Sequence, residues 1–298
     1  MTLEETLKQI RPLNKEAMES AGKRWDSIAK PLHSLGKMED LVIQIAGIQE
    51  TPDISVKKRA LVSMCADNGV VEEGVTQTGQ EVTAIVAENF LSGDTSACVM
   101  CRQCGTDVFP VDVGMVVNTK VPTDLKVAMG TKNMTKEPAM TREEAVKGLE
   151  AGIEMVRRLK EKGYTLLATG EMGIGNTTTS SAVASVLLDE PVEKMTGRGA
   201  GLSSEGLNRK IAAIKKAVEV NKPDPSDAVD VLAKVGGFDI AGMAGVFLGG
   251  AALRVPVVID GFISCVSALI AKRICPTAGD YMIASHVSKV PAARLLLE

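Results

Sequence analysis

A carboxylate, closely spaced glycines and a cluster of hydroxyl groups follow one another in segment 164–180, which reads YTLLATGEMGIGNTTTS. The apolar run that ends at Glu171 predicts a strand, and the hydroxyl-rich segment after it predicts the start of a helix. The first turn of a helix offers unpaired N–H groups and a partial positive charge, and Gly170, Gly173 and Gly175 let a phosphate approach the backbone closely. Since parallel α/β sheets bind ligands at the carboxyl ends of their strands, this segment predicts an anion site beside an acid.

The same segment also has a purely structural interpretation. Glycine-rich turns often do no more than connect a strand to a helix, and Asn176 and Thr177 are ordinary helix-capping residues. Two familiar nucleotide motifs do not fit. No lysine follows the second glycine, as a Walker A loop requires, and the third glycine of the dinucleotide-binding motif is missing. An NTPase and an NAD-dependent enzyme are therefore disfavoured.

Four short apolar runs alternate with helical patterns, and each run ends in a carboxylate. The runs are 60–67, 106–112, 164–171 and 255–260, and their last residues are Asp67, Asp112, Glu171 and Asp260. Near-continuous apolar strands separated by helices indicate an α/β fold, with a parallel, Rossmann-like sheet that has helices on both faces. The four acids are expected to converge on the carboxyl edge of that sheet.

Two further helical patterns lie outside the predicted strands. The capping box from Thr141 to Glu144 opens a crossover helix with an apolar side that includes Ala145 and Leu159. Residues 3–30 have helical periodicity and many charges, so residues 1–35 are expected to form a helical annex or a dimer element rather than part of the sheet. No linker or repeat divides the chain, and residues 1–298 are expected to form one domain.

Composition narrows the class of protein. The chain has 298 residues, of which 45% are hydrophobic, enough for a large core. A net charge of -3 and an aromatic content of 3% do not favour a nucleic-acid partner. The first residues are polar and acidic and do not resemble a secretory signal, so a cytoplasmic location is expected. The longest apolar stretch, 240–252, is rich in Gly and Ala and is followed by charges, so no membrane segment is expected.

The chain has six cysteines, which are expected to be reduced thiols because no secretory signal is present. Cys98, Cys101 and Cys104 have a spacing that could hold a metal or an iron–sulfur cluster. The same spacing also places three thiols near one face of a helix, where cysteine is a common small core residue. No glycine or proline separates them and no fourth ligand lies nearby. The helical interpretation is favoured, and neither a metal nor a dissociable cofactor is expected.

Six segments, in order along the chain, resemble the nicotinate-nucleotide:dimethylbenzimidazole phosphoribosyltransferases. The segments are 65–75, 170–178, 197–202, 234–243, 258–262 and 285–288. The resemblance extends over nearly the whole chain. It implies transfer of ribose 5-phosphate from nicotinate mononucleotide to a benzimidazole nitrogen, with loss of nicotinate and inversion at the anomeric carbon, to make the α-ribazole phosphate of the cobalamin lower ligand. It also implies a homodimer, with a heterodimer containing a related subunit as the alternative.

The resemblance implies roles for individual residues around the nucleotide. The pocket for the nucleotide is expected to be shaped by Gly173, Gly175, Thr177 and Thr178. The phosphate is expected to be held by Gly199, Lys210 and Ser285. The residue pattern alone, without the family resemblance, is equally consistent with Lys210 as a solvated lysine on a basic helix face. Near the sugar and base, Glu171 is expected at the reacting centre and Asp260 as an acceptor for hydroxyl groups, although either could be a helix cap.

The wall of the base site is expected to contain Thr78, Val86, Met172 and Ile174, because a flat apolar guest suits aliphatic and thioether groups. Val86 lies where better-known members of the family have an amide. Valine cannot form the hydrogen bond that an amide would offer to the incoming base. The expected acceptors therefore include a substituted benzimidazole, a purine or a phenolic compound as well as dimethylbenzimidazole. His33 replaces a glycine that is usual in the family and is interpreted as a substituted loop residue. His286 is expected to be structural.

The largest departure from the family is at the C-terminus. Family members continue into a helical region in which an Arg-Leu-Gly-Glu-Gly motif provides the general base, and the sequence printed here stops at residue 298. Two alternatives follow. The sequence is a fragment of a longer product, or it is an inactive or auxiliary subunit that needs a partner chain for the base.

Overall fold

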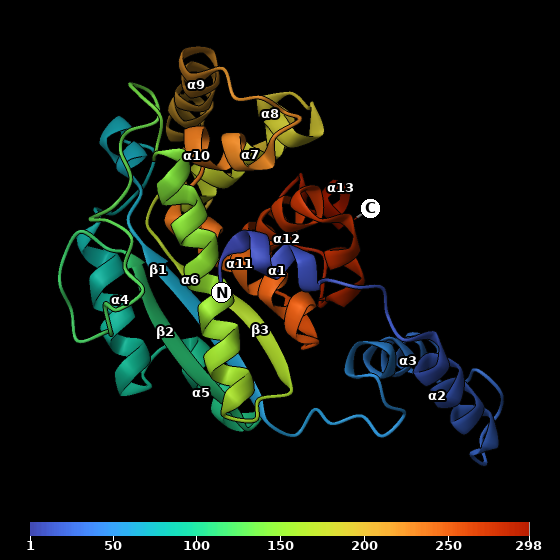
Figure 1. Ribbon diagram of the computed structural model, residues 1–298. Helices are drawn as coiled ribbons and strands as arrows, with labels where there is room; N and C mark the ends of the chain where they lie inside the picture. Colours follow the sequence, from blue (N-terminus) through green and yellow to red (C-terminus); the bar gives the residue numbers. More distant parts are fainter. Residues whose placement is uncertain (298) are drawn as a thin grey trace.

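A computed structural model describes residues 1–297, and Glu298 lies outside them. Its centre is a parallel sheet of five strands in the order β2-β1-β3-β4-β5 (Figure 1). The strands are β1 (Arg59–Ala66), β2 (Thr106–Gly114), β3 (Leu166–Met172), β4 (Val257–Ile259) and β5 (Met282–Ala284). The predicted parallel α/β sheet is confirmed. The sequence did not reveal β5, because three residues are too few to form a recognisable apolar run.

Helices lie on both faces of the sheet, as predicted. The helices are α1 (Leu3–Gln9), α2 (Lys15–Ser27), α3 (Lys37–Gln49), α4 (Glu81–Ser92), α5 (Ser96–Gln103), α6 (Arg142–Glu161), α7 (Asn176–Leu188), α8 (Val192–Met195), α9 (Ser204–Asn221), α10 (Ala228–Val235), α11 (Phe238–Leu253), α12 (Phe262–Ile274) and α13 (Ala293–Leu297). Helices α11 and α12 pack on one face, while α4 and α5 pack on the other face near β1 and β2. The capping box that opens α6 is confirmed.

The strand order contains a topological switch at β1. From β1 the chain crosses to β2 on one side, and it then returns to β3 on the other side and continues outward to β4 and β5. The loops after β1 and β3 therefore leave the sheet in opposite directions and separate at its carboxyl edge. In open parallel sheets this is the place where a cleft forms.

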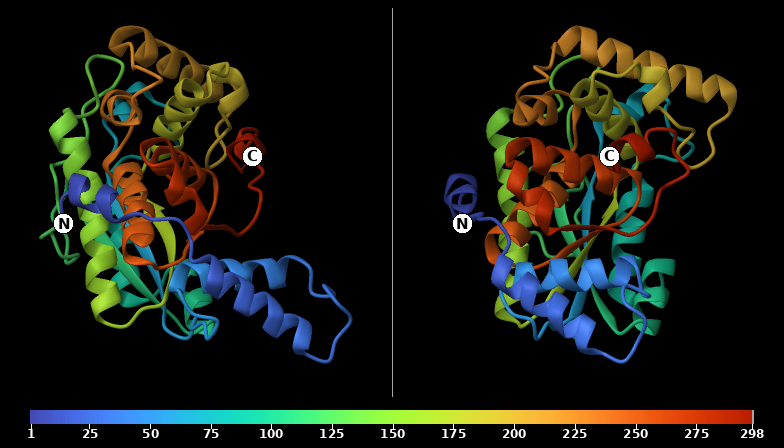
Figure 2. Two further views of the ribbon diagram at one scale, coloured as in Figure 1. Left: turned by 45° about the vertical axis from the view of Figure 1, so that its right-hand side comes forward. Right: turned by 90° about the vertical axis from the view of Figure 1, so that its right-hand side faces the viewer.

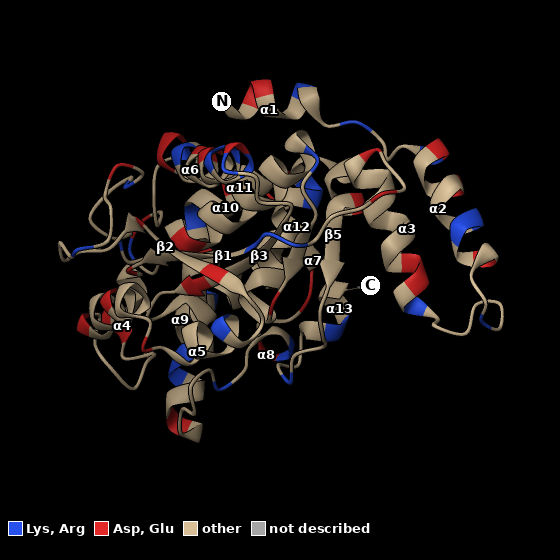
Figure 3. Cartoon of the chain, turned by 90° about the horizontal axis from the view of Figure 1, so that it is seen from below, with Lys and Arg blue, Asp and Glu red and all other residues tan. Residues whose placement is uncertain are grey.

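Helix α11 is buried on nearly all sides and packs closely against α6. Figure 3 shows charges concentrated on the outer helices, whereas α11 has a single charged residue, Asp239. A Cβ atom on Gly245 would lie 1.9 Å from the Leu149 carbonyl oxygen, and one on Gly152 would lie 2.0 Å from the Gly242 carbonyl oxygen. The glycines therefore allow the two backbones to touch. Within residues 1–297, no helix combines the length and apolar composition needed to cross a bilayer.

The N-terminal helices form two separate structures. Helix α1 packs against α6 and α11, whereas α2 pairs with α3 in a hairpin that projects from the body (Figures 1 and 2). His33 lies in the turn of this hairpin with a φ of 57°, in the left-handed region that favours glycine. This backbone conformation explains why glycine is usual at this position in the family that the sequence resembles.

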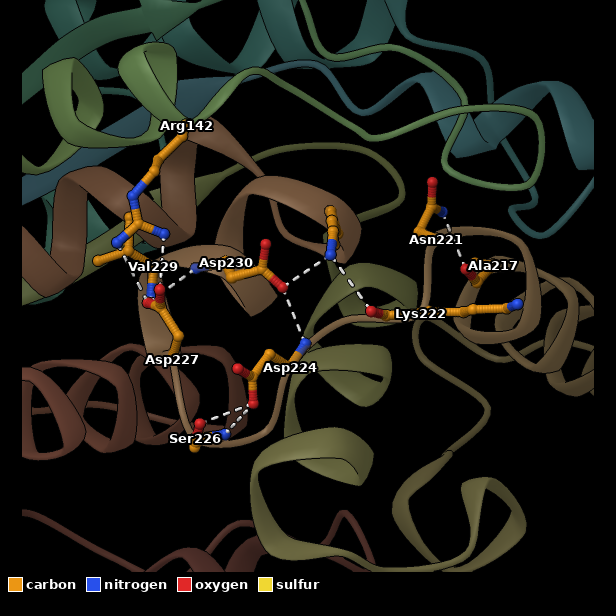
Figure 4. A network of polar contacts seen from close by, with 10 residues as sticks. Arg142, Ala217, Asn221, Lys222, Asp224, Ser226, Asp227, Val229 and Asp230 are labelled. Carbon is orange, nitrogen blue, oxygen red and sulfur yellow. Dashed lines mark hydrogen bonds and ion pairs between the residues drawn. The ribbon is translucent and has the colours of Figure 1, made fainter.

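A polar network fixes the start of α10 against α6 (Figure 4). The Asp227 Oδ1 atom caps α10 by accepting hydrogen bonds from the backbone N–H groups of Val229 and Asp230, at 3.0 and 3.1 Å. Arg142, the first residue of α6, forms an ion pair of 2.7 Å with Asp227. The Asp224 N–H group donates to Asp230 and holds the preceding loop. These contacts fix the helix that leads directly into α11.

The close contact between α6 and α11 generates a stability prediction. Gly245→Ala should lower the free energy of unfolding by about 2–4 kcal/mol, because its methyl group would overlap a backbone carbonyl that cannot rotate away. Gly22→Ala is the matched control. On α2 the nearest atom to a new Cβ is Ile43 Cδ1 at 3.7 Å, so better helix propensity should raise stability by up to about 1 kcal/mol. Urea unfolding of both variants checks this, and equal stabilities would contradict it.

Candidate active site

Three adjoining cavities form a cleft at the carboxyl edge of the sheet. The central cavity lies between the end of β3, the end of β4 and the 197–202 loop, and its lining includes Gly170, Glu171, Thr177, Gly199 and Asp260. It shares Thr177 and Gly199 with a second cavity and Glu171 and Asp260 with a third. The cleft is thus a continuous surface around Glu171 and Thr177, at the switch point of the sheet.

The second cavity, called here the loop cavity, is lined by segments 75–78, 173–177 and 198–202. It brings together six of the residues predicted from the sequence, namely Thr78, Gly173, Ile174, Gly175, Thr177 and Gly199. Gly175 has a φ of 96° and precedes the first turn of α7, so the left-handed turn requires glycine at this position. The N–H groups of Asn176 and Thr178 donate to the carbonyl oxygens of Gly173 and Gly175, at 3.1 and 2.9 Å, so the first turn of α7 offers the cleft chiefly the N–H group of Thr177.

The third cavity, called here the sheet-face cavity, has a volume of about 380 Å³. Its floor consists of small and apolar strand residues, including Leu61, Ala168 and Gly170, and its wall includes Phe90 and Met100 from α4 and α5. Glu171, Asp260 and Ser285 also line it. The cavity is therefore an apolar slot with acids at one end.

Lys210 is a buried cation directly behind Thr177, which lines this cleft; Lys210 itself lines none of the three cavities. Its side chain on α9 is 1% exposed, and its Nζ atom donates a hydrogen bond of 2.7 Å to Thr177 Oγ1. No carboxylate pairs with Lys210 among the residues that the structure describes. Burial lowers the pKa of Lys210 to about 8. The solvated-lysine interpretation is therefore wrong, and the arrangement suits an anion at the edge of the loop cavity.

Glu171 shares a hydrogen-bond donor with a second acid. The Asn176 Nδ2 atom donates to Glu171 Oε2 at 2.6 Å and to Asp239 Oδ2 at 2.9 Å. Burial raises the pKa of Glu171 to about 7, and the charges of Asp239 and Asp260 act in the same direction. Burial likewise raises the pKa of Asp239 to about 6. Glu171 can therefore gain or lose a proton near neutral pH.

Sequence reasoning did not identify Asp239 as a site residue. It lies in segment 234–243, which contributed to the family resemblance, but its carboxylate is at the start of an apolar helix and no strand ends there. The available signal was a lone acid in a long apolar stretch, separated by one residue from the pair Gly236 and Gly237. Such a pattern indicates close backbone approach to a buried charge.

Two of the four strand-end acids do not reach the cleft, which corrects the prediction that all four would converge. Asp67 Oδ2 accepts a hydrogen bond of 2.8 Å from the Val116 N–H group. Asp112 accepts from the backbone after β2 and forms an ion pair of 3.1 Å with Lys126. The chain after β2 folds back over the ends of β1 and β2 and binds both acids. Glu171 and Asp260 are the pair that lines the cleft.

Of four other residues predicted from the sequence, one lines a cavity of the cleft and three lie outside all three cavities. Ser285 lines the sheet-face cavity, and its Oγ atom lies 2.9 Å from His286 Nδ1. Thr178 is fully buried in α7, and Met172 packs with a small apolar cluster on the α4 side of the sheet. Val86 lies on α4, one turn before Phe90. Thr178, Met172 and Val86 line none of the three cavities as the structure describes them.

The three closely spaced cysteines lie on or directly after α5, as the helical interpretation predicts. Cys98 is buried, Cys101 is half-buried in the wall of the sheet-face cavity, and Cys104 is exposed. Across residues 1–297, no group of three potential metal-ligating side chains comes together.

The fold and the cleft define the class of this protein as a Rossmann-like α/β enzyme. The family model described as "Phosphoribosyltransferase" matches residues 10–298. A nicotinate-nucleotide–dimethylbenzimidazole phosphoribosyltransferase from Ruminiclostridium cellulolyticum is 52% identical over 300 residues, which cover 100% of this chain and 85% of the relative. The enzyme of the same name from Acetivibrio thermocellus is 49% identical over 296 residues, or 99% of this chain and 84% of the relative.

Solved structures agree with these relatives. The crystal structure of CobT from Thermus thermophilus matches with a TM-score of 0.89 and 37% identity, over 95% of this chain and 85% of that chain. The chain belongs to the family of nicotinate-nucleotide–dimethylbenzimidazole phosphoribosyltransferases, and it is accordingly a pentosyltransferase.

The burial of Lys210 generates a second prediction. Lys210→Met should raise the free energy of unfolding at pH 7 by about 1–3 kcal/mol, because it removes a buried cation that lacks a counterion. The pKa of Lys210 is lower in the folded state, so wild-type stability should increase as the pH rises from 8 towards 10.5, and the advantage of the variant should shrink. Lys215→Met, at an exposed site, is the control. A Lys210→Met protein no more stable than wild type at pH 7 would contradict the prediction.

Proposed function

We propose that this protein transfers the ribose 5-phosphate of nicotinate mononucleotide to 5,6-dimethylbenzimidazole or a related base. The products are α-ribazole 5′-phosphate and nicotinate, for assembly of the cobalamin nucleotide loop. The observation that carries the proposal is the buried, carboxylate-free Lys210 ammonium group at a cleft that also contains Glu171. The names of the relatives support this choice of substrates.

The phosphate of the donor binds between Lys210 and the first turn of α7. Lys210 supplies the charge, and Thr177, which Lys210 already contacts, supplies a hydroxyl group. Gly199 has a φ of 55°, and a Cβ atom there would lie 3.0 Å from Thr177 Oγ1, so a side chain would crowd the hydroxyl group that Lys210 contacts. This anchoring places the ribose in the central cavity, where Glu171 and Asp260 face it.

The transfer exchanges one bond at C1′ for another. The bond from C1′ to the pyridine nitrogen breaks and its electron pair stays on nicotinate. The lone pair of a base nitrogen forms the new bond from the opposite side, and the N–H proton of the base passes to water. Positive charge that develops at C1′ is stabilised by the carboxylates of Glu171 and Asp260, which both line the central cavity.

The acceptor base lies beside Glu171, with Thr78 and Ile174 on the side of the loop cavity. Met172 and Val86 act from behind this wall, since neither lines a cavity. Val86 brings no amide to the base, so the site selects by shape more than by hydrogen bonding. Dimethylbenzimidazole, other benzimidazoles, purines and phenolic compounds are the acceptors to compare.

We also propose that the protein acts as a homodimer in the cytoplasm. The hairpin of α2 and α3 carries exposed apolar side chains, with Leu32 67%, Leu35 50% and Met38 57% exposed. Apolar side chains gathered on a projecting element support contact with a second copy. Sedimentation equilibrium tests this, and a monomer at micromolar concentration would contradict it.

The proposed phosphate site generates a binding prediction. Lys210→Ala should weaken binding of nicotinate mononucleotide by about 1.5–3 kcal/mol, the usual range for a hydrogen bond to a charged group. Isothermal titration calorimetry measures the affinity. Lys215→Ala, which removes an exposed lysine of the same helix, should leave it unchanged. Equal affinity of the Lys210 variant and wild type would remove Lys210 from the phosphate site.

The proposed reacting centre generates a rate prediction. Glu171→Gln should lower the rate of nicotinate release by about 10²–10³-fold while the protein still folds, because a neutral amide cannot stabilise positive charge at C1′. Glu205→Gln, at an exposed position on α9, should keep the wild-type rate. A folded Glu171→Gln protein that releases nicotinate at the wild-type rate would exclude Glu171 from the mechanism.

A further inference from the structure

Asp239 is a buried carboxylate where three of the segments that carry the family resemblance meet. It is fully buried, and no lysine or arginine pairs with it within residues 1–297. Asn176, at the start of α7, donates a hydrogen bond of 2.9 Å to its Oδ2 atom, and Asn68, from the loop after β1, lies beside it next to Gly237. A Cβ atom on Gly173 would lie 2.4 Å from Asp239 Oδ2, and one on Gly237 would lie 2.6 Å from Asp239 Oδ1. The two glycines thus let the backbone close directly onto this acid.

A single nitrogen atom joins Asp239 to Glu171. An amide nitrogen has two hydrogens, and Asn176 Nδ2 donates to both carboxyl groups, at 2.6 Å to Glu171 and 2.9 Å to Asp239. The arrangement fixes the Glu171 carboxyl group in the central cavity and holds a second acid directly behind it. Two carboxylates this close and this poorly solvated cannot both ionise easily.

The other titratable groups around Glu171 do not offset this repulsion. Asp260, at the end of β4, is also acidic. Cys65 on β1 is a buried thiol with a pKa raised to about 12, so it is neutral. Lys210 lines none of the three cavities, and its Nζ atom donates to Thr177 rather than to either acid. The acids behind and beside Glu171 therefore dominate its electrostatic environment.

We propose that Asp239 is a positioning residue that acts through the shared amide of Asn176, holding the Glu171 carboxyl group in place and keeping one proton on the pair at neutral pH. With one proton shared, the pair keeps one negative charge beside the central cavity, where it can stabilise positive charge at C1′ in the proposed transfer. This role in transfer rests on the proposed function. The sharing of one proton between Glu171 and Asp239 is independent of the proposed function.

A helix-capping role does not explain Asp239. Helix α11 starts at Phe238 after the N-cap Gly237, and this N-cap makes no side-chain capping bond. The Asp239 Oδ1 atom instead accepts from the N–H group of the adjacent Ile240, at 3.0 Å. Asparagine has the same shape and would avoid burying a charge, so a purely structural site would favour it. The charge itself is the feature that needs a function.

The test is an infrared titration of the C=O stretch of protonated carboxylic acid, without substrate. Glu171→Gln identifies the band of Glu171. Asp239→Asn is isosteric and should lower the titration midpoint of that band by about one pH unit or more, since it removes the like charge. The pH–rate profile for nicotinate release should shift with it. Asp53→Asn, at an exposed ion pair with Arg24, is the control and should leave both midpoints unchanged. An unchanged midpoint in Asp239→Asn would overturn the proposal.

Asn176→Ala gives an independent test, in which the titration midpoint of Glu171 should shift in the opposite direction. The amide favours the charged form of Glu171, so its loss should raise the titration midpoint. If Asp239→Asn does not fold, an upward shift in Asn176→Ala supports the proposal and an unchanged midpoint overturns it. Shifts in the infrared midpoints together with no transfer to any base would contradict the proposed function and leave the coupling of the two acids established.

Discussion

The contact between α6 and α11 is the constraint on which the arrangement of the site depends. Helix α11 is apolar on nearly all sides, so it must be enclosed by the sheet, α6 and α12. Glycines at the crossing, including Gly152 and Gly245, let the backbones touch and leave α11 a single position along its axis. That position puts its first turn beneath the carboxyl end of β3. Asp239 reaches Glu171 because the core fixes the helix that carries it.

The site contains charged groups next to this core that lower the free energy of unfolding. Lys210 is buried without a carboxylate partner among the described residues, and one amide group holds the half-buried Glu171 and the buried Asp239. Each lowers the stability of the folded protein, and each is placed where a phosphate or a reacting sugar would interact with it. Proteins keep such groups when function requires them, and the closely packed core around α11 provides the stability that offsets them.

The topology explains why the strand-end acids differ in role. Asp67 and Asp112 lie at the carboxyl ends of β1 and β2, where the chain folds back across the sheet edge and supplies N–H groups and Lys126 as partners. Glu171 and Asp260 lie at the carboxyl ends of β3 and β4, beyond the switch point, where the connecting loops diverge and leave a cleft. The same residue type at equivalent strand ends is thus structural on one side of the switch and faces a ligand site on the other.

The sequence by itself determined the parallel sheet, the crossover helix with its capping box, the glycine-rich turn after Glu171 and the family, because these depend on local periodicity and on motifs that are contiguous in the chain. Only the tertiary structure decided that Lys210 is buried and that Asn176 joins Glu171 to Asp239, which lies 63 residues beyond Asn176 in the chain. Burial and proximity of charges depend on which distant segments pack together. A pattern confined to neighbouring residues carries no information about such long-range packing.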